Sequence, residues 1–481
     1  MSSATLASKT FDADDQAAFA RLSGDVNPLH MDPLAARRTQ AGTTVVHGIH
    51  AVLWALDRLV ESGAAGAGIA SLKVQFAKFI PVGGTVALKL VRRDDRSIRA
   101  ELALGALTTT ILNVGLGQRR KGEAGETRDG PAVGLGDRPA VLARPEEAAG
   151  LSGSLDTAGP ARSVASRFPH AVASMGPERV AAVVLLSSLV GMVCPGLHSI
   201  FAAFAVDFTD APGSGLGFGV TGIDDRFRMV RMAVRGAGVE GSVQAFMRWP
   251  PVAQASMSEV SKLVAPDEFA ATTTLIVGGS RGLGALTAKV IAAGGGKVIA
   301  TYARGREEAQ QLAGEIRGHA PKGTCDIIPY DARRSPAAQL DALATGVSHL
   351  YYFASAPIAR QKEGVFVPDL FDEFVQVYVK GFHDCCRFLG ERGSLTAFYP
   401  SSVFVGNPPQ GMLEYAMAKI AGELLCDGLN RAGGRVRVTV ERLPRLLTDQ
   451  TATVPPVDAG DPLEVMLPVI RRVQSTTFDQ G

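Results

Sequence analysis

Apolar positions along the chain follow two different periodicities. Between residues 71 and 249 they alternate in short runs such as "SLKVQFAKF", "SIRAELALG", "RFRMVRMAVRG" and "GSVQAFMRW", a pattern typical of half-buried antiparallel strands. From residue 272 onward, β-branched runs are separated by helix-length segments: "TTTLIVGG", "KVIATYA", "TCDIIPYD", "VSHLYYFAS", "SLTAFYPSS" and "RVRVTVERL". This second pattern predicts a doubly wound parallel sheet with crossover helices.

Two apolar segments in the first part of the chain look alike. "VVHGIHAVLWALDRL" at 45–59 and "VCPGLHSIFAAFAV" at 193–206 share a glycine, an aliphatic residue and a histidine, which pairs Gly48 with Gly196 and His50 with His198. Because apolar residues occupy nearly all sides of both segments, each is expected to begin a helix that a sheet wraps. Both histidines are interpreted as packed residues. The prediction is therefore a multidomain α+β and α/β chain, with two such copies followed by a Rossmann-type unit.

Composition changes mark the expected boundaries. Residues 119–149 lose hydrophobic periodicity and fill with glycine, proline and charge, as a linker does, and a weaker boundary falls near "KLVAPDEFAATTT". We therefore expect domains at 1–118, 150–262 and 268–456. Residues 457–481 form a C-terminal extension, whose proline-rich start and short helix suggest a lid or an interface.

Composition and charge narrow the class of protein. With 46% hydrophobic and 20% charged residues over 481 positions, the chain reads as a globular protein of several domains. A net charge of +2 with scattered arginines argues against a nucleic-acid partner. The five cysteines show no zinc-type spacing, so no metal is expected. The N-terminus lacks a secretion signal, and the run "VAAVVLLSSLVGMV" falls short of a membrane span, so we expect a cytoplasmic protein with no membrane partner.

The stretch "LSGDVNPLH" places Asp25 and His30 close together around a proline. Pro28 disfavours helical backbone at Asn27, so the stretch is expected to be a turn across which the two side chains converge. A carboxylate beside an imidazole can hold one water molecule and pass protons either way. Gly48, at the expected helix N-terminus, can offer a backbone N–H to a carbonyl oxygen. Taken alone, such a pair is more often structural, with Asp25 as a helix cap and His30 on the surface.

The wider context favours chemistry. "FARLSGDVNPLHMDPLAAR" followed by "GTTVVHGIHA" resembles the (R)-specific enoyl-CoA hydratase motif of the MaoC-like hot dog family, over roughly the first 115 residues. The resemblance implies that Asp25 and His30 activate water, that Asn27 supports the loop, and that the amide of Gly48 polarises a thioester. Residues 150–262 look like a degenerate second hot dog copy without an Asp–x4–His pair. This copy is expected to complete the sheet and shape an acyl tunnel.

A second constellation begins with "LIVGGSRGLGALTAKV", a strand, a glycine-rich turn and a helix. Such a turn lets the backbone approach a pyrophosphate at the helix N-terminus. The turn residues expected to meet a nucleotide are Gly278, Ser280, Arg281, Gly282, Leu283 and Gly284. Downstream, Tyr415 and Lys419 share a helix face, so the ammonium is expected to lower the pKa of the tyrosine, and Ser402 can hydrogen-bond the same substrate oxygen.

Together these residues resemble the short-chain dehydrogenase/reductase family over about residues 270–450. The resemblance implies catalysis by Ser402, Tyr415 and Lys419, and cofactor contacts from Asp331, Ala354, Tyr415 and Lys419. No acidic residue ends the second strand, "VIATYARGREE", whereas Arg281, Arg304 and Arg306 can meet a 2′-phosphate, so NADP is favoured over NAD.

Three positions depart from that family's pattern. The Asn-Ala-Gly after the fourth strand reads "FASAP", the proton-relay asparagine of the fourth helix is replaced by Tyr378, and the Pro-Gly after the sixth strand is Pro444-Arg445. The departures leave Ser402, Tyr415 and Lys419 in place. They predict either an atypical reductase or a unit that binds nucleotide without turnover.

The two chemistries share an intermediate, a (3R)-hydroxyacyl thioester. The sequence therefore predicts a bifunctional hydratase/dehydratase and 3-ketoacyl reductase, acting on a coenzyme A or acyl-carrier-protein thioester in the direction from ketone to alkene. One alternative is a hydratase whose C-terminal unit only binds nucleotide or directs assembly. A non-catalytic scaffold that docks an acyl carrier protein is another. A homodimer is expected by family analogy.

Overall fold

The computed structural model describes residues 4–65, 68–121, 132–133, 140–141, 145–211, 213–320, 322–341, 346–356, 358, 366–452 and 457–476. Two compact units meet in sequence between Pro250 and Pro251. Each is described by itself below.

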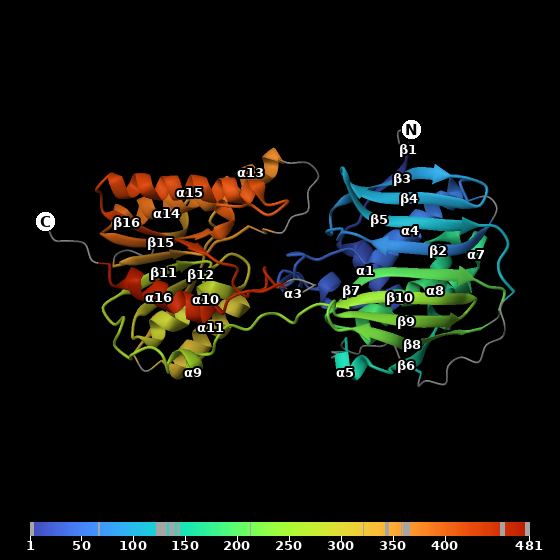
Figure 1. Cartoon of the computed structure of the whole chain (residues 1–481), viewed down its shortest axis with the longest axis horizontal. Helices are drawn as coiled ribbons and strands as arrows, with labels where there is room; N and C mark the ends of the chain where they lie inside the picture. The colour runs from blue at the N-terminus through green and yellow to red at the C-terminus, as the bar shows by residue number, and fades with distance from the viewer. Residues whose placement is uncertain are drawn as a thin grey trace. The chain divides into compact units, whose positions relative to one another are not determined.

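The first unit is built on one ten-stranded antiparallel sheet in the order β1-β3-β4-β5-β2-β7-β10-β9-β8-β6 (Figure 1). Its strands are β1 (Ala4–Thr10), β2 (Ile69–Phe76), β3 (Thr85–Arg93), β4 (Ser97–Leu104), β5 (Leu107–Leu116), β6 (Ser152–Asp156), β7 (Ser199–Phe208), β8 (Gly215–Asp224), β9 (Met229–Gly236) and β10 (Val239–Met247). Read from either edge, the two halves have the same topology, and β2 and β7 pair at the centre. The expected repeat of two sheet-forming copies is therefore confirmed.

One buried helix belongs to each half of this sheet. They are α4 (Gly48–Glu61) and α8 (Pro177–Ser188), and α8 continues as a π-helix over Leu189–Val193. The two helices pack against each other and against α7 (Pro169–Met175), on the same face of the sheet (Figure 1). Most residues of both helices are buried, chiefly leucine, valine and alanine, because each helix is enclosed by the sheet and by neighbouring helices.

The predicted second helix at 193–206 is wrong. The helix ends at Val193, and Ser199–Phe208 is strand β7. Pro195 has no backbone N–H to continue the helix, and Gly196 has φ +79°, a left-handed conformation that ends it. The segment that follows is rich in phenylalanine and pairs with β2 and β10. Gly196 and His198 therefore do not correspond to Gly48 and His50.

The expected boundaries are only partly visible. Most of the linker predicted at 119–149 lies outside the described residues, and the described parts attach to the second half, where the backbone of Val141 bonds to Met192 and Leu197. The first unit ends at Pro250, so the predicted boundary at residue 262 is wrong. Residues 251–262 belong to the second unit, where Met257 and Val260 of α9 (Met257–Val260) are buried in the core. The remaining short helices of the first unit are α1 (Ala13–Ser23), α2 (Pro28–Met31), α3 (Pro33–Ala36), α5 (Pro145–Ala148), α6 (Ala158–Ser163) and a 3-10 turn (Val164–Ser166).

The second unit is a six-stranded parallel sheet in the order β13-β12-β11-β14-β15-β16, the order of a doubly wound dinucleotide-binding fold. Its strands are β11 (Thr273–Val277), β12 (Lys297–Tyr302), β13 (Thr324–Pro329), β14 (His349–Tyr352), β15 (Leu395–Ser402) and β16 (Val436–Leu443). All six were predicted from their apolar runs, and the Rossmann-type class is confirmed.

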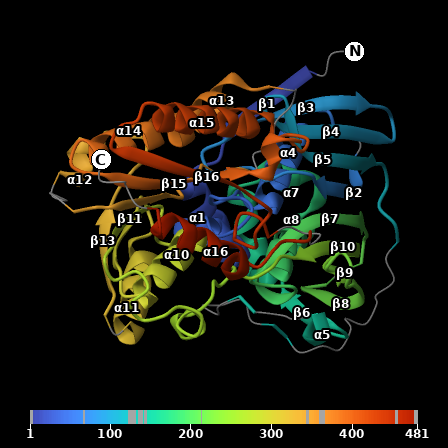
Figure 2. The same ribbon diagram turned by 60° about the vertical axis from the view of Figure 1, so that its left-hand side comes forward.

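Helices cover both faces of this sheet. Helices α10 (Gly282–Ala293), α11 (Arg306–His319) and α16 (Pro462–Gln474) lie on one face, and α14 (Gly381–Gly390) and α15 (Leu413–Arg431) lie on the other (Figure 2). The segment expected to be a lid or an interface forms α16, whose Met466, Ile470 and Val473 are fully buried in the core. The remaining elements are α12 (Ala337–Leu340), α13 (Pro368–Val375), a π-helix (Gln376–Lys380) and a 3-10 turn (Val403–Val405).

Among the described helices, none is by itself long and apolar enough to cross a bilayer. The pair Pro169–Met175 and Pro177–Val193 meets that test by combined length and composition, but it is bent by 117°. The run "VAAVVLLSSLVGMV" lies in this pair and is buried within the first unit.

Asp57 on α4 links this helix to the N-terminus of α7. Its buried carboxylate accepts hydrogen bonds from the backbone amides of His170 (2.8 Å) and Ala171 (3.0 Å), at the N-terminus of α7. Asp57→Ala leaves these amides without that acceptor and should lower the free energy of unfolding by about 1–3 kcal/mol. Urea denaturation measures the change. Glu61→Ala removes an exposed carboxylate from the same helix and should cost under about 0.5 kcal/mol; an equal loss in the two variants would contradict the assignment.

Candidate functional sites

Helix α1 ends at Gly24 and delivers Asp25 into the interior of the first unit. Gly24 has φ +75°, and Asp25 and Asn27 are each 1% exposed. Asn27 has an extended backbone, as Pro28 predicted, but the stretch is not a turn alone: Pro28 starts the one-turn helix α2, which carries His30. Asn27 caps this helix by accepting a hydrogen bond from the amide of Leu29. The proline thus fixes the position at which the helix begins.

Asp25 and His30 converge as expected. The carboxylate of Asp25 and ring nitrogens of His30 and His47 lie within 4.8 Å of one another. Nδ1 of His30 is 2.8 Å from the carbonyl oxygen of Val45, so in the neutral ring Nδ1 donates a proton to this bond and Nε2 carries the lone pair. This tautomer leaves Nε2 as the proton acceptor.

The carboxylate of Asp25 is fully buried, and burial raises its pKa. Three contacts oppose this shift: the charge of His30, a 2.6 Å hydrogen bond from the Ser187 hydroxyl, and one from the backbone amide of Asn27. Ser187 lies on α8 of the second half. Sequence reasoning missed it, because the only available signal was a pair of serines inside an otherwise apolar run.

His47 is a second residue that the sequence reasoning missed. Its Nδ1 lies 2.9 Å from Oε1 of Gln16, its Nε2 lies 3.0 Å from the carbonyl oxygen of Asp25, and its ring stacks on His30 with centroids 4.0 Å apart. Burial lowers the pKa of His47 well below its usual value. Although Asp25, His30 and His47 are close enough to hold a metal ion, both nitrogens of His47 already face oxygen atoms. The ring therefore braces the loop.

Gly48 is the first residue of α4, as predicted. A Cβ atom there would lie 2.6 Å from a ring carbon of Phe76, so a side chain at this position would require the ring to move. Phe76 packs against Phe201 of β7, with ring centroids 5.0 Å apart. The first amides of a helix have no partner within the helix and carry partial positive charge. Gly48 thus combines an amide of this kind with an aromatic wall drawn from both halves of the sheet.

The second half encloses the Asp25 loop directly. Nδ2 of Asn27 donates to the carbonyl oxygens of Gly191 (2.7 Å) and Gly196 (3.2 Å), and a Cβ atom at Gly191 would lie 2.4 Å from Oδ1 of Asp25. The second half therefore contacts the Asp25 loop directly, in addition to completing the sheet as predicted. Its role in shaping an acyl tunnel stays a prediction. The histidines interpreted as packed behave so: His50 stacks on Phe19, and burial lowers the pKa of His198 to about 4.

In the second unit, the glycine-rich turn joins β11 to α10. Gly278 has φ +78°, and a Cβ atom there would lie 2.8 Å from the carbonyl carbon of Phe353. A Cβ atom at Gly284 would lie 2.2 Å from the carbonyl oxygen of Gly278. These close approaches require glycine, and the turn leads to the N-terminus of α10 at Gly282, the kind of position at which a phosphate binds. Ser280 and Leu283 belong to the same turn, so the residues present fit a nucleotide.

The other expected cofactor residues follow the carboxyl ends of neighbouring strands. Arg304, Asp331 and Ala354 come after β12, β13 and β14. Asp331 accepts a hydrogen bond from the amide of Arg333, and Arg304 is exposed. Arg281 forms an ion pair with the buried carboxylate of Asp449 at 3.6 Å. Arg304 is therefore better placed than Arg281 to meet a phosphate.

Ser402, Tyr415 and Lys419 come together from β15 and α15. Ser402 ends β15, and its side chain is close enough to Tyr415 to oppose the rise in the pKa of that phenol. Nζ of Lys419 donates to the carbonyl oxygen of Pro400 at 2.6 Å. The expected lowering of the Tyr415 pKa is wrong in this structure, because burial raises it to about 12. Burial also lowers the pKa of Lys419 to about 7. Desolvation by burial is the largest cause of both shifts.

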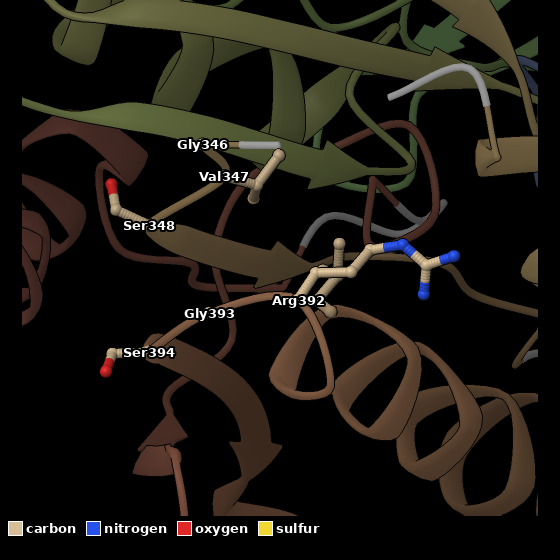
Figure 3. Close-up of a pocket in the computed structure, with 7 residues that line it drawn as sticks. Gly346, Val347, Ser348, Arg392, Gly393 and Ser394 are labelled. Carbon is tan, nitrogen blue, oxygen red and sulfur yellow. The ribbon is translucent and has the colours of Figure 1, made fainter. Parts of the chain in front are cut away.

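An open pocket of about 220 Å³ lies elsewhere in the second unit, lined by residues such as Ser348, Arg392 and Ser394 (Figure 3). It sits at the amino ends of β14 and β15, whereas ligands of parallel sheets bind at the carboxyl ends. The side chain of Arg392 extends away from both serines and bonds to Asp341 and the carbonyl oxygen of Phe388. The polar groups do not converge, so this pocket is not the candidate site.

The two constellations define a chain with a hot dog-type acid–imidazole site and a dinucleotide-binding unit, and comparison with known proteins agrees. Residues 2–114 match the MaoC like domain family and residues 272–455 match the short chain dehydrogenase family. The (R)-specific enoyl-CoA hydratase of Aeromonas caviae is 34% identical over 120 residues, which cover 24% of this chain and 86% of that protein. The chain therefore belongs to the MaoC-like dehydratase family through its first domain, and its second unit matches the short chain dehydrogenase family over residues 272–455.

Other similar proteins match shorter or more distant parts. The peroxisomal hydratase-dehydrogenase-epimerase of Saccharomyces cerevisiae is 37% identical over 75 residues, which span 16% of this chain but only 8% of that protein. Among solved structures, a 3-oxoacyl (acyl-carrier-protein) reductase from Agrobacterium tumefaciens has 21% identity and a TM-score of 0.38, covering 43% of this chain and 88% of that one. The oxidoreductase yciK from E. coli has 18% identity and a TM-score of 0.39, covering 44% and 95%.

Asn27 is predicted to hold the two halves of the first unit together locally. Asn27→Ala removes donors to the carbonyls of Gly191 and Gly196, and should lower the free energy of unfolding by about 1–3 kcal/mol. Hydrogen exchange of the amides in 189–197 should accelerate in this variant. Peptides of the parallel sheet serve as the internal control and should exchange at unchanged rates. Unaltered exchange in 189–197 would show that the contact is dispensable.

Proposed function

We propose that the first unit adds water to 2-enoyl thioesters, or removes it from (3R)-hydroxyacyl thioesters, and that the second unit reduces 3-ketoacyl thioesters with NADP(H). The observation that carries the proposal is the convergence of Asp25 and His30 beside the first amide of α4. The match of residues 2–114 to the MaoC like domain family supports the proposed hydratase. The match of residues 272–455 to the short chain dehydrogenase family supports the proposed reductase.

For hydration, we assign Asp25 and His30 to one water molecule. One of the two groups accepts a proton from the water as its oxygen bonds to C3 of the alkene, and a proton is delivered to C2 from the pair, so that H and OH add across the double bond. The amide of Gly48 donates a hydrogen bond to the thioester oxygen, on which negative charge develops. Asn27 and Ser187 keep the carboxylate in position through the second half.

For reduction, Tyr415 donates its phenolic proton to the ketone oxygen and Ser402 hydrogen-bonds the same oxygen. A nicotinamide cofactor, when bound, supplies the hydride to the carbonyl carbon. Gly278, Gly282 and Gly284 would hold its pyrophosphate, and Asp331 its adenine. We assign NADP because Arg304 follows β12, where an acidic residue would select a ribose hydroxyl.

Joining the two units raises the local concentration of the shared hydroxyacyl thioester. We place the reactions in the order ketone, alcohol and alkene, because NADPH is usually held reduced in cells. The acyl group is carried either by coenzyme A or by an acyl carrier protein. We also propose a homodimer, which is supported by the exposed apolar side chains that follow one face of α15: Met417, Ile420 and Leu424.

Two substitutions separate the activities. Asp25→Asn should reduce hydration of crotonyl-CoA by about 2 to 4 orders of magnitude, and leave the oxidation of NADPH by acetoacetyl-CoA unchanged. Tyr415→Phe should do the reverse. Rates are followed by ultraviolet absorbance, with NADH and acyl-carrier-protein thioesters in parallel. A wild-type chain that hydrates but never reduces would support the hydratase-only alternative, and inactivity in both assays would support a scaffold.

The Ser187 hydroxyl is predicted to set the pH dependence of hydration. The Asp25–His30 pair takes up a proton only while the Asp25 carboxylate is ionised, so activity falls as pH drops through the pKa of Asp25, which burial raises. Ser187→Ala removes a hydrogen bond that favours the carboxylate, so the acidic limb of the kcat profile should move to higher pH. Ser188→Ala is the matched control, since that hydroxyl donates to the backbone carbonyl of Ser23. Equal profiles for the wild type and Ser187→Ala would refute this role.

A further inference from the structure

The ammonium group of Lys419 lies among three aromatic rings. Its Nζ is 4.2 Å from the ring centroid of Tyr378, 4.9 Å from that of Tyr399 and 5.8 Å from that of Tyr415. The rings come from the π-helix, β15 and α15, and all three are buried. A cation over an aromatic face is attracted by the ring quadrupole, and the attraction increases when water is excluded.

Tyr378 provides the nearest ring. Its hydroxyl is 2.9 Å from Oγ of Ser355 and 3.5 Å from the carbonyl oxygen of Ala356, in the loop after β14. Its ring packs edge-to-face against Tyr415, with centroids 5.6 Å apart. The hydroxyl therefore anchors the ring to the cofactor side of the sheet while the ring contacts Lys419. The family resemblance implies a proton-relay asparagine at the position of Tyr378. Tyrosine differs from asparagine in offering an aromatic ring.

We propose that Tyr378 is a positioning residue of the reductase site, and that its ring keeps the Lys419 ammonium charged and held beside Tyr415 in place of the polar side chain expected there. The proposal builds on the reductase function assigned to the second unit. Substitutions of Tyr378 should change the pH profile of ketone reduction and, independently of turnover, the titration of Lys419.

The charged surroundings of Lys419 fix the direction of the expected effect. Glu423, one turn later on α15, favours the ammonium, but its carboxylate is shared with Ser401 and with Arg442 of β16. The thiol of Cys426 lies on the same helix. Burial is the largest influence and lowers the pKa of Lys419 to about 7. Removing an attractive ring should lower that pKa further, so the ammonium should be lost at a lower pH.

The kinetic test compares Tyr378→Leu with Tyr378→Phe. The basic limb of the pH profile for ketone reduction reports loss of the ammonium, and it should move down by about 0.5 to 1 pH unit in Tyr378→Leu. Tyr378→Phe keeps the ring and should leave this limb in place. A trifluorinated phenylalanine at position 378 preserves the size of phenylalanine but weakens the ring quadrupole. It should reproduce the downward shift even if the leucine variant does not fold.

The independent test observes Lys419 in the whole chain. Lysine labelled with 13C at Cε is titrated by nuclear magnetic resonance, and Lys419→Met identifies the signal. The Lys419 signal should titrate at lower pH in Tyr378→Leu and in the fluorinated variant than in wild type and Tyr378→Phe. Identical titration in all four would overturn the proposal. Because this readout needs no turnover, a chain that reduces no ketone would remove the proposed reductase function without deciding the role of Tyr378.

Discussion

A buried carboxylate at Asp25 is the constraint on which the first unit depends. An ionised carboxylate loses its hydration on burial and must recover hydrogen bonds from the protein. Asp25 recovers them from the backbone of Asn27 within its own loop and from Ser187 across the sheet repeat. The Asn27 side chain secures the same loop to Gly191 and Gly196. The site therefore exists only when both halves are folded against each other.

This dependence explains how the second half can lack an acid–imidazole pair and still be required. Its strands repeat the topology of the first half, and the pairing of β7 with β2 makes one continuous sheet. Without that pairing, β2 would present an unpaired edge, and α4 would lose a helix that covers it. The second half serves the first through its fold, its Ser187 hydroxyl and its close-packed Gly191.

Much of this architecture could be predicted from local patterns. The six parallel strands were found because β-branched runs and glycine turns are local signals, and Asp25, His30 and Gly48 were found because a motif joins them. Helix α8 was missed because no motif marks its start, although it is apolar on nearly all sides like α4. The Gly-x-His pattern shared by Gly48 and Gly196 led instead to a predicted helix at 193–206, where the structure has strand β7. His47 and Ser187 could not be predicted from local patterns, because they contact Gln16 and Asp25, which lie far away in the sequence.

The two candidate sites are shaped by the same force acting on opposite charges. Burial raises the pKa of Asp25 and lowers that of Lys419 to about 7, so each group is moved towards its neutral form. The means of keeping charge differ. Asp25 is held by directional donors, the Ser187 hydroxyl and the Asn27 amide. Lys419 lies against aromatic rings, which favour a cation without admitting water. Hydration requires a water molecule in the site, whereas hydride transfer is protected by excluding it. The polar surroundings of one group and the aromatic surroundings of the other therefore match the separate demands of the two proposed reactions.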